Sequence, residues 1–453
     1  MTDDSTPLPS AAEASPESRI AALEARLAAV QQEKARCALF FERSVMGILL
    51  GDPSGNIRDA NPRAAEMLGY DIAALRRMNI RELIHPEDQE AVSVNVGIEA
   101  ARAGKAFKVE RRYRCKDGTW LALQVDFSAL DERGELFQVM LQDIGRRKAA
   151  EALGLKWYDS CDAMLADPEL DAIYVATNNA THAKLCLAAL KAGKHVIVEK
   201  PMATSIADAR KMIDTAKKLK LSLAVDHMMV HNAYNIKARK LVADGALGKV
   251  NDACFHMEFA YGYDPAEAAT WRCSNVREMG GPIGDVASHC FYMAEFIYDS
   301  TVEWVAAVYL PKLMDIKAED GAYIKFGMAN GITASAKVAF SEPRGGLVGT
   351  LTNLGYEIYG DGAVLRGFGT MFQLSGYPDE PIKIRLEVDS KAGQKKVAPG
   401  KIQNIYQALI TGHAKSVLSK RPLCGCDAMR NLELCEATHR SARHHGRKVS
   451  IVK

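Results

Sequence analysis

The sequence lacks any long apolar segment. Its purely apolar runs are short, as at residues 185–190, whereas a membrane-spanning helix needs about 20 such residues. The first ten residues are polar and acidic and contain no apolar signal core. We therefore predict a cytoplasmic protein that does not engage membranes.

The sequence also lacks an excess of either charge. Its 58 basic and 56 acidic side chains leave a net charge of +2, so no global field favours binding to nucleic acid. Its 453 residues, of which 48% are hydrophobic, suffice for about three globular domains.

Cysteine pairs with the spacing of a metal site are missing. Of the ten cysteines only Cys424 and Cys426 are close neighbours, and no second pair complements them. We therefore predict no bound metal. Scattered cysteines are typical of reduced thiols, and we interpret Cys424 and Cys426 as two incidental thiols in a loop.

The N-terminal region contains two patterns. Residues 1–16 are rich in Ser, Pro, Ala and acidic residues, a composition that predicts a disordered tail. Residues 17–39 carry a 3-4-3-4-3 spacing from Ile20 to Cys37. This spacing fits a parallel dimerisation helix and fits equally a single amphipathic helix packed on its own protein.

Residues 40–150 predict an α+β domain. Turn residues at 116–119 and 131–134 indicate hairpins between the last three strands. Strands are expected over 47–52, 57–61, 109–115, 120–129 and 136–144, and a helix over 62–70. The segments FERSVMGILLGDPSGNIRDANPRAAEMLGY, IRELIHPEDQE and ERRYRCKDGTWLAL resemble, in this order, a PAS domain of the S-box type. The resemblance implies a sensing and dimerisation module, with an unknown ligand or with a core filled by its own side chains.

From residue 151 the pattern changes to alternating strands and helices. Strands at 171–177, 195–198 and 221–225 alternate with helices at 180–192 and 205–219, which predicts βαβ units and a parallel sheet. Ligands bind at the carboxyl ends of strands in such sheets. Lys200 follows one of these strands, where a lysine can present a cation or a proton to a reacting oxygen.

A second candidate group is Asp285 with His289. The two residues are four apart after a Gly-Gly-Pro helix start, so they share one helix face. A carboxylate beside an imidazole is a plausible acid/base pair near neutral pH.

Five segments in order resemble the glucose–fructose oxidoreductase and inositol dehydrogenase family, Gfo/Idh/MocA. They are LADPELDAIYVATNNATH, AALKAGKHVIVEKPMATS, ARKLVADGALGKV, TWRCSNVREMGGPIGDVASH and RPLCGCDAMRNLELCEATHRSARHHGRKVSI. The resemblance implies an α/β fold: a Rossmann-type parallel sheet over 151–226, then an α/β domain over 227–453 with a large, mostly antiparallel sheet through which homo-oligomers form. Strands of that sheet are expected over 302–309, 321–327, 331–339, 351–360, 363–367 and 382–388.

The resemblance also implies a reaction and its residues. The reaction is hydride transfer between NAD or NADP and a small-molecule substrate, a polyol, sugar or cyclic diol. The cofactor supplies the hydride chemistry and the protein supplies orientation and proton transfer. The implied catalytic residues are Lys200, Asp285 and His289, and the implied cofactor-binding residues are Thr177, Asn178, His182, Glu199, Lys200, Trp271 and Arg272.

The sequence departs from the family at two places. No Gly-x-Gly-x-x-Gly follows a strand before residue 177, so we predict a truncated parallel sheet that lacks the usual phosphate-binding loop. The family's arginines before a proline are replaced by a segment with Asp226, His227 and His231, for which we favour substrate hydrogen bonding or packing over a metal. We predict an oxidoreductase with impaired cofactor binding or, as the alternative, a non-catalytic metabolite-binding sensor or scaffold.

Overall fold

The computed structural model describes residues 31–32, 36, 38–105, 107–131, 133–341, 354–371 and 384–451. The chain divides into two compact units, Met1–Asp159 and Ser160–Lys453. The predicted tail 1–16 lies outside the described residues, as does most of the predicted helix 17–39, whose described residues are helical. In the part of the chain that is described, no helix is long and apolar enough to cross a membrane.

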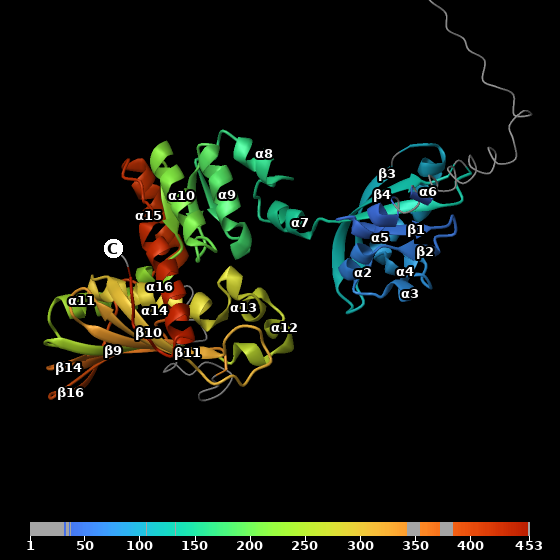
Figure 1. Ribbon diagram of the computed structural model, residues 1–453. Helices are drawn as coiled ribbons and strands as arrows, with labels where there is room; N and C mark the ends of the chain where they lie inside the picture. Colours follow the sequence, from blue (N-terminus) through green and yellow to red (C-terminus); the bar gives the residue numbers. More distant parts are fainter. Residues whose placement is uncertain are drawn as a thin grey trace, which may run out of the picture. The chain divides into compact units, whose positions relative to one another are not determined.

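The first unit is built on a five-stranded antiparallel sheet (Figure 1). Its order is β2-β1-β5-β4-β3, with β1 Gly47–Gly51, β2 Ile57–Ala60, β3 Phe107–Arg114, β4 Trp120–Ala129 and β5 Phe137–Asp143. The helices are α2 Pro62–Leu68, α3 Ile72–Leu75, α4 Ile80–Leu83, α5 Pro86–Ala91, α6 Val94–Arg102 and α7 Gly145–Ala152. The predicted α+β fold is confirmed.

Local polar contacts and a packed core explain this unit. The buried Asn61 side chain accepts hydrogen bonds from the Ile48 N–H at 2.8 Å and the Ala64 N–H at 2.9 Å, which joins β1 to the start of α2. Between Leu49 and Phe127 the core retains a cavity of about 20 Å³. A cavity of that size holds about one water molecule, so the side chains themselves fill the core.

The second unit contains a parallel sheet in the order β6-β7-β8. Its strands are β6 Ala172–Val175, β7 His195–Val198 and β8 Leu223–Val225, connected by α9 Asn179–Lys191 and α10 Ile206–Leu219. Within the described residues of this unit only α8, Cys161–Ala166, precedes β6. The sheet therefore has three strands there, in agreement with the predicted truncation.

A nine-stranded sheet forms the rest of the second unit, in the order β16-β15-β14-β13-β9-β12-β11-β10-β17. All neighbouring pairs are antiparallel except β9 with β12, which confirms the mostly antiparallel sheet. The strands are β9 Val250–Glu258, β10 Val302–Tyr309, β11 Gly321–Met328, β12 Thr333–Ala339, β13 Leu354–Gly360, β14 Ala363–Phe368, β15 Arg385–Ser390, β16 Gly393–Val397 and β17 Val449–Ser450.

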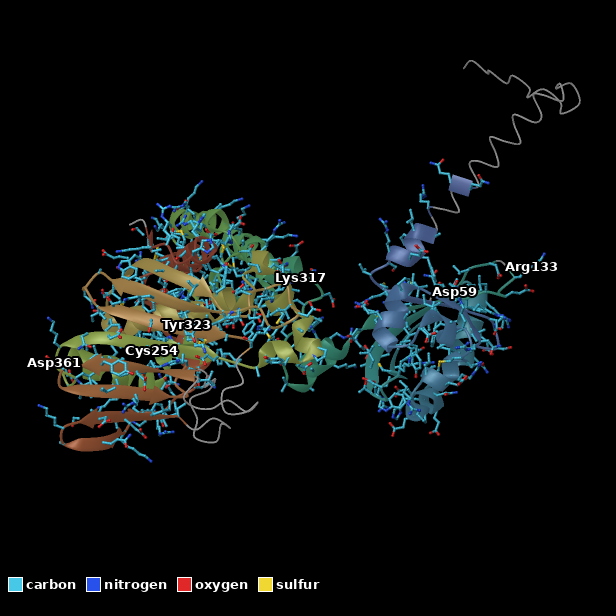
Figure 2. The ribbon with its side chains drawn as sticks, turned by 60° about the horizontal axis from the view of Figure 1, so that its bottom comes forward. Asp59, Arg133, Cys254, Lys317, Tyr323 and Asp361 are labelled. Carbon is cyan, nitrogen blue, oxygen red and sulfur yellow. A yellow bond between two sulfur atoms is a disulfide. The ribbon has the colours of Figure 1, made fainter. Side chains whose placement is uncertain are left out.

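Helices cover one face of this sheet. They are α11 Ala233–Ala243, α14 Ser288–Tyr298 and α16 Cys426–Arg443 (Figure 1), while α15 Ile405–Leu418 packs against the parallel sheet. The opposite face carries side chains such as Cys254 and Tyr323 (Figure 2). Short segments complete the unit: η1 Met228–His231, η2 Tyr261–Tyr263, α12 Pro265–Ala268, α13 Trp271–Ser274, η3 Val276–Glu278 and the π-helical η4 Ile283–Ala287.

The two sheets of the second unit share one hydrophobic core. Val196 and Leu223 of the parallel sheet belong to the same buried cluster as Phe255 and Phe326 of the large sheet. The structure separates the chain after Asp159, near the boundary predicted at residue 150. The division at residue 226 remains a prediction.

Candidate functional site

A cavity of about 1180 Å³ opens at the carboxyl ends of β6 and β7. Polar side chains line the end near the parallel sheet, and aromatic side chains line much of the remainder. The lining includes Thr177, Asn179, Glu199, Lys200, Met228, Met257, Phe259, Tyr261, Tyr263, Asp264, Glu267, Trp271, Arg272, Asp285, His289, Phe340 and Tyr406. The large sheet and the parallel sheet therefore both contribute walls to the cavity.

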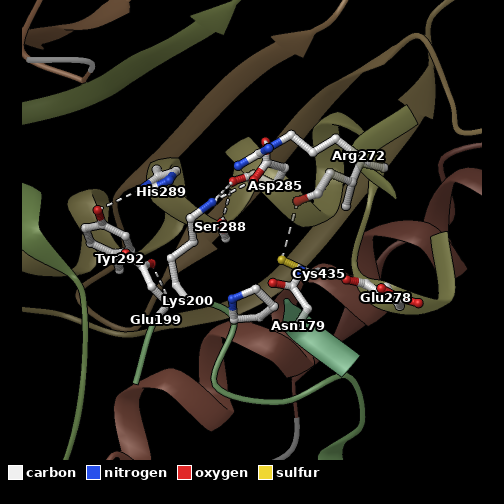
Figure 3. Close-up of polar contacts among 12 residues, drawn as sticks. Asn179, Glu199, Lys200, Arg272, Glu278, Asp285, Ser288, His289, Tyr292 and Cys435 are labelled. Atoms are coloured by element: carbon white, nitrogen blue, oxygen red, sulfur yellow. Dashed lines mark hydrogen bonds and ion pairs between the residues drawn. The ribbon is translucent and has the colours of Figure 1, made fainter. Parts of the chain in front are cut away.

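Lys200 directs its ammonium group at Asp285 (Figure 3). The Lys200 Nζ donates to the Asp285 backbone oxygen at 2.7 Å and to Asp285 Oδ1 at 2.8 Å. The side chains are only 14% and 11% exposed, so water screens this ion pair weakly. The pair joins the end of β7 to η4, two elements that lie 85 residues apart in the sequence.

Asp285 binds a second cation on its other oxygen. The Arg272 Nε donates to Asp285 Oδ2 at 3.2 Å. Burial alone would raise the pKa of Asp285, but the charges of Lys200 and Arg272 outweigh burial and lower it. Asp285 is therefore a carboxylate at neutral pH.

The helix that carries Asp285 begins at a glycine that no other residue replaces easily. Gly281 has a φ of +83°, and an added Cβ would lie 2.5 Å from the Glu319 carboxylate. Glu319 occupies this space and accepts a hydrogen bond from the Ile283 N–H at 2.9 Å. The Gly-Gly-Pro start predicted from the sequence thus fixes the beginning of η4.

His289 is buried and has Tyr292 as its partner. The His289 Nδ1 lies 2.7 Å from the Tyr292 hydroxyl, one turn along α14. Burial, with the charge of Lys200 and the neighbouring His227, lowers the pKa of His289 well below its ordinary value. The imidazole is therefore neutral, and when its Nδ1–H donates to Tyr292 its Nε2 is free to accept a proton.

This arrangement differs from one predicted detail. We expected the Asp285 carboxylate to lie beside the imidazole of His289 as an acid/base pair. The Asp285 carboxylate instead contacts Lys200 and Arg272, and Tyr292 contacts the imidazole. The reason is that Arg272 of α13 places its guanidinium next to the carboxylate.

Two predicted cofactor-binding residues lie away from the cavity lining. His182 is fully buried, with Nδ1 2.8 Å from the Pro201 oxygen and Nε2 3.0 Å from the Thr177 oxygen. It joins the loops that follow β6 and β7. Asn178 is the exposed N-cap residue of α9. Thr177, Glu199, Lys200, Trp271 and Arg272 line the cavity as the resemblance implied.

Two carboxylates, the buried Asp226 and the half-buried Glu199, contact Tyr174. The Tyr174 hydroxyl contacts Asp226 Oδ2 and lies 3.3 Å from Glu199 Oε1. Burial, together with the charge of Glu199, raises the pKa of Asp226 to about 6, although the Tyr174 hydrogen bond opposes the shift. The sequence pattern did not indicate Tyr174, because its role follows from the pairing of β6 with β7.

The neighbouring histidines are buried as well. The His227 ring packs 4.3 Å from the Tyr292 ring, and burial lowers the pKa values of His227 and His231. Among the described residues, no group of three or more His, Cys, Asp or Glu side chains is arranged to hold a metal ion.

Three family models match the chain. A PAS fold model matches residues 57–140, a model of the oxidoreductase family with an NAD-binding Rossmann fold matches 120–227, and the GFO/IDH/MocA C-terminal domain matches 235–366. The chain is a fusion of a PAS domain and a GFO/IDH/MocA oxidoreductase body. Both the PAS and the Rossmann models include residues 120–140, which in the structure comprise β4 and the start of β5 in the sheet of the first unit.

Curated relatives of this PAS–GFO/IDH/MocA fusion act on sugars and polyols, as their names state. The 1,5-anhydro-D-fructose reductase of Ensifer adhaerens is 30% identical over 47% of this chain and 62% of its own length. The myo-inositol 2-dehydrogenase of Thermotoga maritima is 29% identical over 49% of this chain and 62% of its own length. The chain thus spans less than two thirds of these relatives.

Solved structures share the fold of about two thirds of the chain. The aldose-aldose oxidoreductase of Caulobacter crescentus, in complex with glycerol, has a TM-score of 0.58 at 25% identity, covering 67% of this chain and 88% of its own. An inositol dehydrogenase homolog of Azotobacter vinelandii, in complex with NADH and myo-inositol, has a TM-score of 0.54 at 19% identity. The match covers 67% of this chain and 86% of the homolog.

Proposed function

We propose that the second unit is an oxidoreductase that transfers hydride between NAD or NADP and a polyol, a sugar or a cyclic alcohol. One observation carries this proposal: an ammonium group fixed by Asp285 shares a cavity with the neutral imidazole of His289. The names of the sugar and polyol relatives support the substrate class.

The roles follow from the charges. In alcohol oxidation, His289 takes the hydroxyl proton at Nε2, and Lys200 stabilises the developing alkoxide. Asp285 is a positioning residue, because its contacts hold the ammonium of Lys200 in place. A bound nicotinamide supplies the hydride acceptor.

The cavity suits the nicotinamide end of such a cofactor. Its volume of about 1180 Å³ exceeds the ~300–1,000 Å³ of ordinary small-molecule sites, so a ring and a substrate fit together. Thr177, Glu199, Trp271 and Arg272 are the lining residues that would hold the ring and its ribose, with Asn178 at the start of α9.

The cavity offers few groups that could bind the diphosphate of the cofactor, and we propose that cofactor binding is impaired. The cavity lining contains two cations, Lys200 and Arg272, and both contact Asp285. Glu199, Asp264 and Glu267 add further carboxylates to the lining. A pyrophosphate prefers backbone N–H groups and free cations, and the glycine-rich loop that usually provides them is missing from the sequence.

The same charge distribution favours a second candidate function. A cavity with carboxylate and aromatic walls binds a neutral polyhydroxy compound without any dinucleotide. In this alternative the unit is a metabolite-binding sensor or scaffold, and the PAS domain relays the signal or assembles the protein.

Calorimetric titration of the full chain with NADH, with NADPH and with a panel of sugars and cyclic polyols tests both functions. We expect dinucleotide dissociation constants weaker than ~1 μM, equivalent to about −8.2 kcal/mol, and measurable alcohol oxidation at millimolar cofactor. A dissociation constant below that value would contradict impaired binding. Polyol binding without turnover at saturating cofactor would contradict the enzyme and support the sensor.

A further inference from the structure

Cys424 and Cys426 form a disulfide bond across one intervening glycine. The prediction of two incidental reduced thiols is therefore wrong. Seven other described cysteines are free, among them the exposed Cys161. Spacing alone did not reveal the bond, because it depends on the backbone conformation between the two residues.

The backbone brings the two sulfur atoms together at the start of a long helix. Gly425 has a φ of +65°, and the two Cα atoms lie 5.3 Å apart. Cys426 is the first residue of the 18-residue helix α16, and its N–H donates to Cys424 Sγ at 3.2 Å. This contact places the Cys424 sulfur at the N-terminal end of α16.

The pair is accessible, unlike most cysteines of this unit. Cys424 and Cys426 are half-buried, whereas Cys186, Cys290 and Cys435 are buried. Burial raises the pKa values of those three thiols, Cys186 and Cys435 to about 12. Thiol reagents therefore meet Cys424 and Cys426 before the buried thiols.

The segment that contains the pair contacts β8 and His227, which lie next to the candidate site. The Leu223 N–H of β8 donates to the Leu423 oxygen at 3.0 Å, and the Leu423 N–H donates to Ser222 Oγ at 3.0 Å. On the other side of the pair, Asp427 Oδ2 lies 4.0 Å from His227 Nε2. His227 packs on Tyr292, the partner of His289.

We propose that Cys424 and Cys426 form a reversible thiol–disulfide exchange site whose redox state controls the order of β8 and the His227 segment. The bond holds the start of α16 and thereby the position of Asp427 opposite His227. This inference does not rest on the proposed oxidoreductase activity.

The oxidant is a small disulfide, RSSR, and the exchange is balanced. The thiolate of one cysteine attacks a sulfur of RSSR, forms a mixed disulfide and releases one RS⁻. The second thiolate attacks the cysteine sulfur of the mixed disulfide, which forms the Cys424–Cys426 bond and releases the second RS⁻. The pair loses two electrons and two protons, and RSSR becomes two RSH.

The full chain is equilibrated in buffers with increasing ratios of oxidised to reduced glutathione, quenched in acid, alkylated with N-ethylmaleimide and digested with trypsin. We expect the peptide that carries both cysteines to change from two labels to none in one step, and to recover both labels in dithiothreitol. Cys161 is the matched control and should form only a mixed disulfide. A pair that remains doubly labelled in oxidised glutathione, or ends as mixed disulfides, would overturn the proposal.

Hydrogen exchange tests the link to the site without any turnover assay. Reduction should accelerate amide exchange in residues 222–232 several-fold and leave β3 to β5 of the first unit unchanged. Cys424→Ser should show the fast exchange in both buffers, and Cys161→Ser should respond like the natural chain. Identical exchange of the oxidised and reduced natural chain in residues 222–232 would refute control of the His227 segment.

Discussion

The buried ion pair between Lys200 and Asp285 makes a prediction that needs no substrate. We consider Lys200→Met, Asp285→Asn and the double variant. Asp285→Asn leaves Lys200 and Arg272 without their carboxylate, whereas Lys200→Met leaves Asp285 paired with Arg272. The single change at Asp285 should therefore be the more damaging.

The magnitude follows from the distance and the burial. At 2.8 Å and an effective dielectric constant of about 20, the gross attraction is about 6 kcal/mol before desolvation. Removal of one partner of a buried pair typically costs about 3–5 kcal/mol, and we expect that loss for Asp285→Asn. The double variant should recover most or all of the two single losses, because both charges of the Lys200–Asp285 pair are then removed and neither is left without the other.

Guanidinium denaturation measures these losses. Trp120 and Trp157 precede residue 160, where the second unit begins, so their replacement by Phe leaves Trp271 and Trp304 as reporters of that unit. All variants are made in this background. If the losses add to within about 0.5 kcal/mol, the ion pair does not exist in solution and the reasoning about the site fails.

Three further predictions concern catalysis, pH and assembly. Lys200→Ala and His289→Ala should each reduce any measured turnover about 10²–10⁴-fold with an unchanged circular dichroism spectrum, and full activity in both would refute the assigned roles. Burial raises the pKa of Asp226 from 3.8 to about 6, so the folded protein favours the protonated carboxyl. The contribution of this group to the free energy of unfolding is fully present below pH 3.8 and is lost as the pH rises through 6. Asp226→Asn should therefore stabilise the second unit at pH 7 by about 1–3 kcal/mol relative to its effect at pH 4, and the same stability difference between variant and natural chain at both pH values would contradict this. The protein should sediment as a homo-oligomer at micromolar concentration, since Tyr323 and Val308 are 50% and 45% exposed on the sheet face opposite the helices, and a monomer would contradict it.

Local patterns predicted most of the strands and helices. The alternation and turn residues of 107–143 gave β3, β4 and β5 within a few residues, because a hairpin depends on neighbouring residues. The sequence pattern did not indicate β9 or its parallel pairing with β12, since that pairing joins segments about 80 residues apart. Long-range register depends on the packing of the whole sheet.

The site shows the same division between local and distant contacts. Lys200 was found because a strand end is a local feature with a known place in a parallel sheet. Tyr292 lies one turn after His289, so its contact follows from helix spacing once both residues are placed on one helix. The contact of Arg272 with Asp285 joins residues of two separate short helices, α13 and η4, and residue spacing does not predict it.

The energetics of the pair allow a functional role to be distinguished from a purely structural one. A buried ion pair is often no more stable than apolar side chains of similar volume, and its replacement frequently gains about 1–4 kcal/mol. Lys200 and Asp285 nevertheless remain together in a cavity wall, where Arg272 and the neutral His289 are also present. Packing alone gives no reason to keep two charges there, whereas alkoxide stabilisation requires the ammonium and its positioning carboxylate. If function retained the pair, Lys200→Met with Asp285→Asn should preserve or raise the stability of the second unit and still abolish turnover, whereas a marked loss of stability in the double variant would indicate a purely structural role.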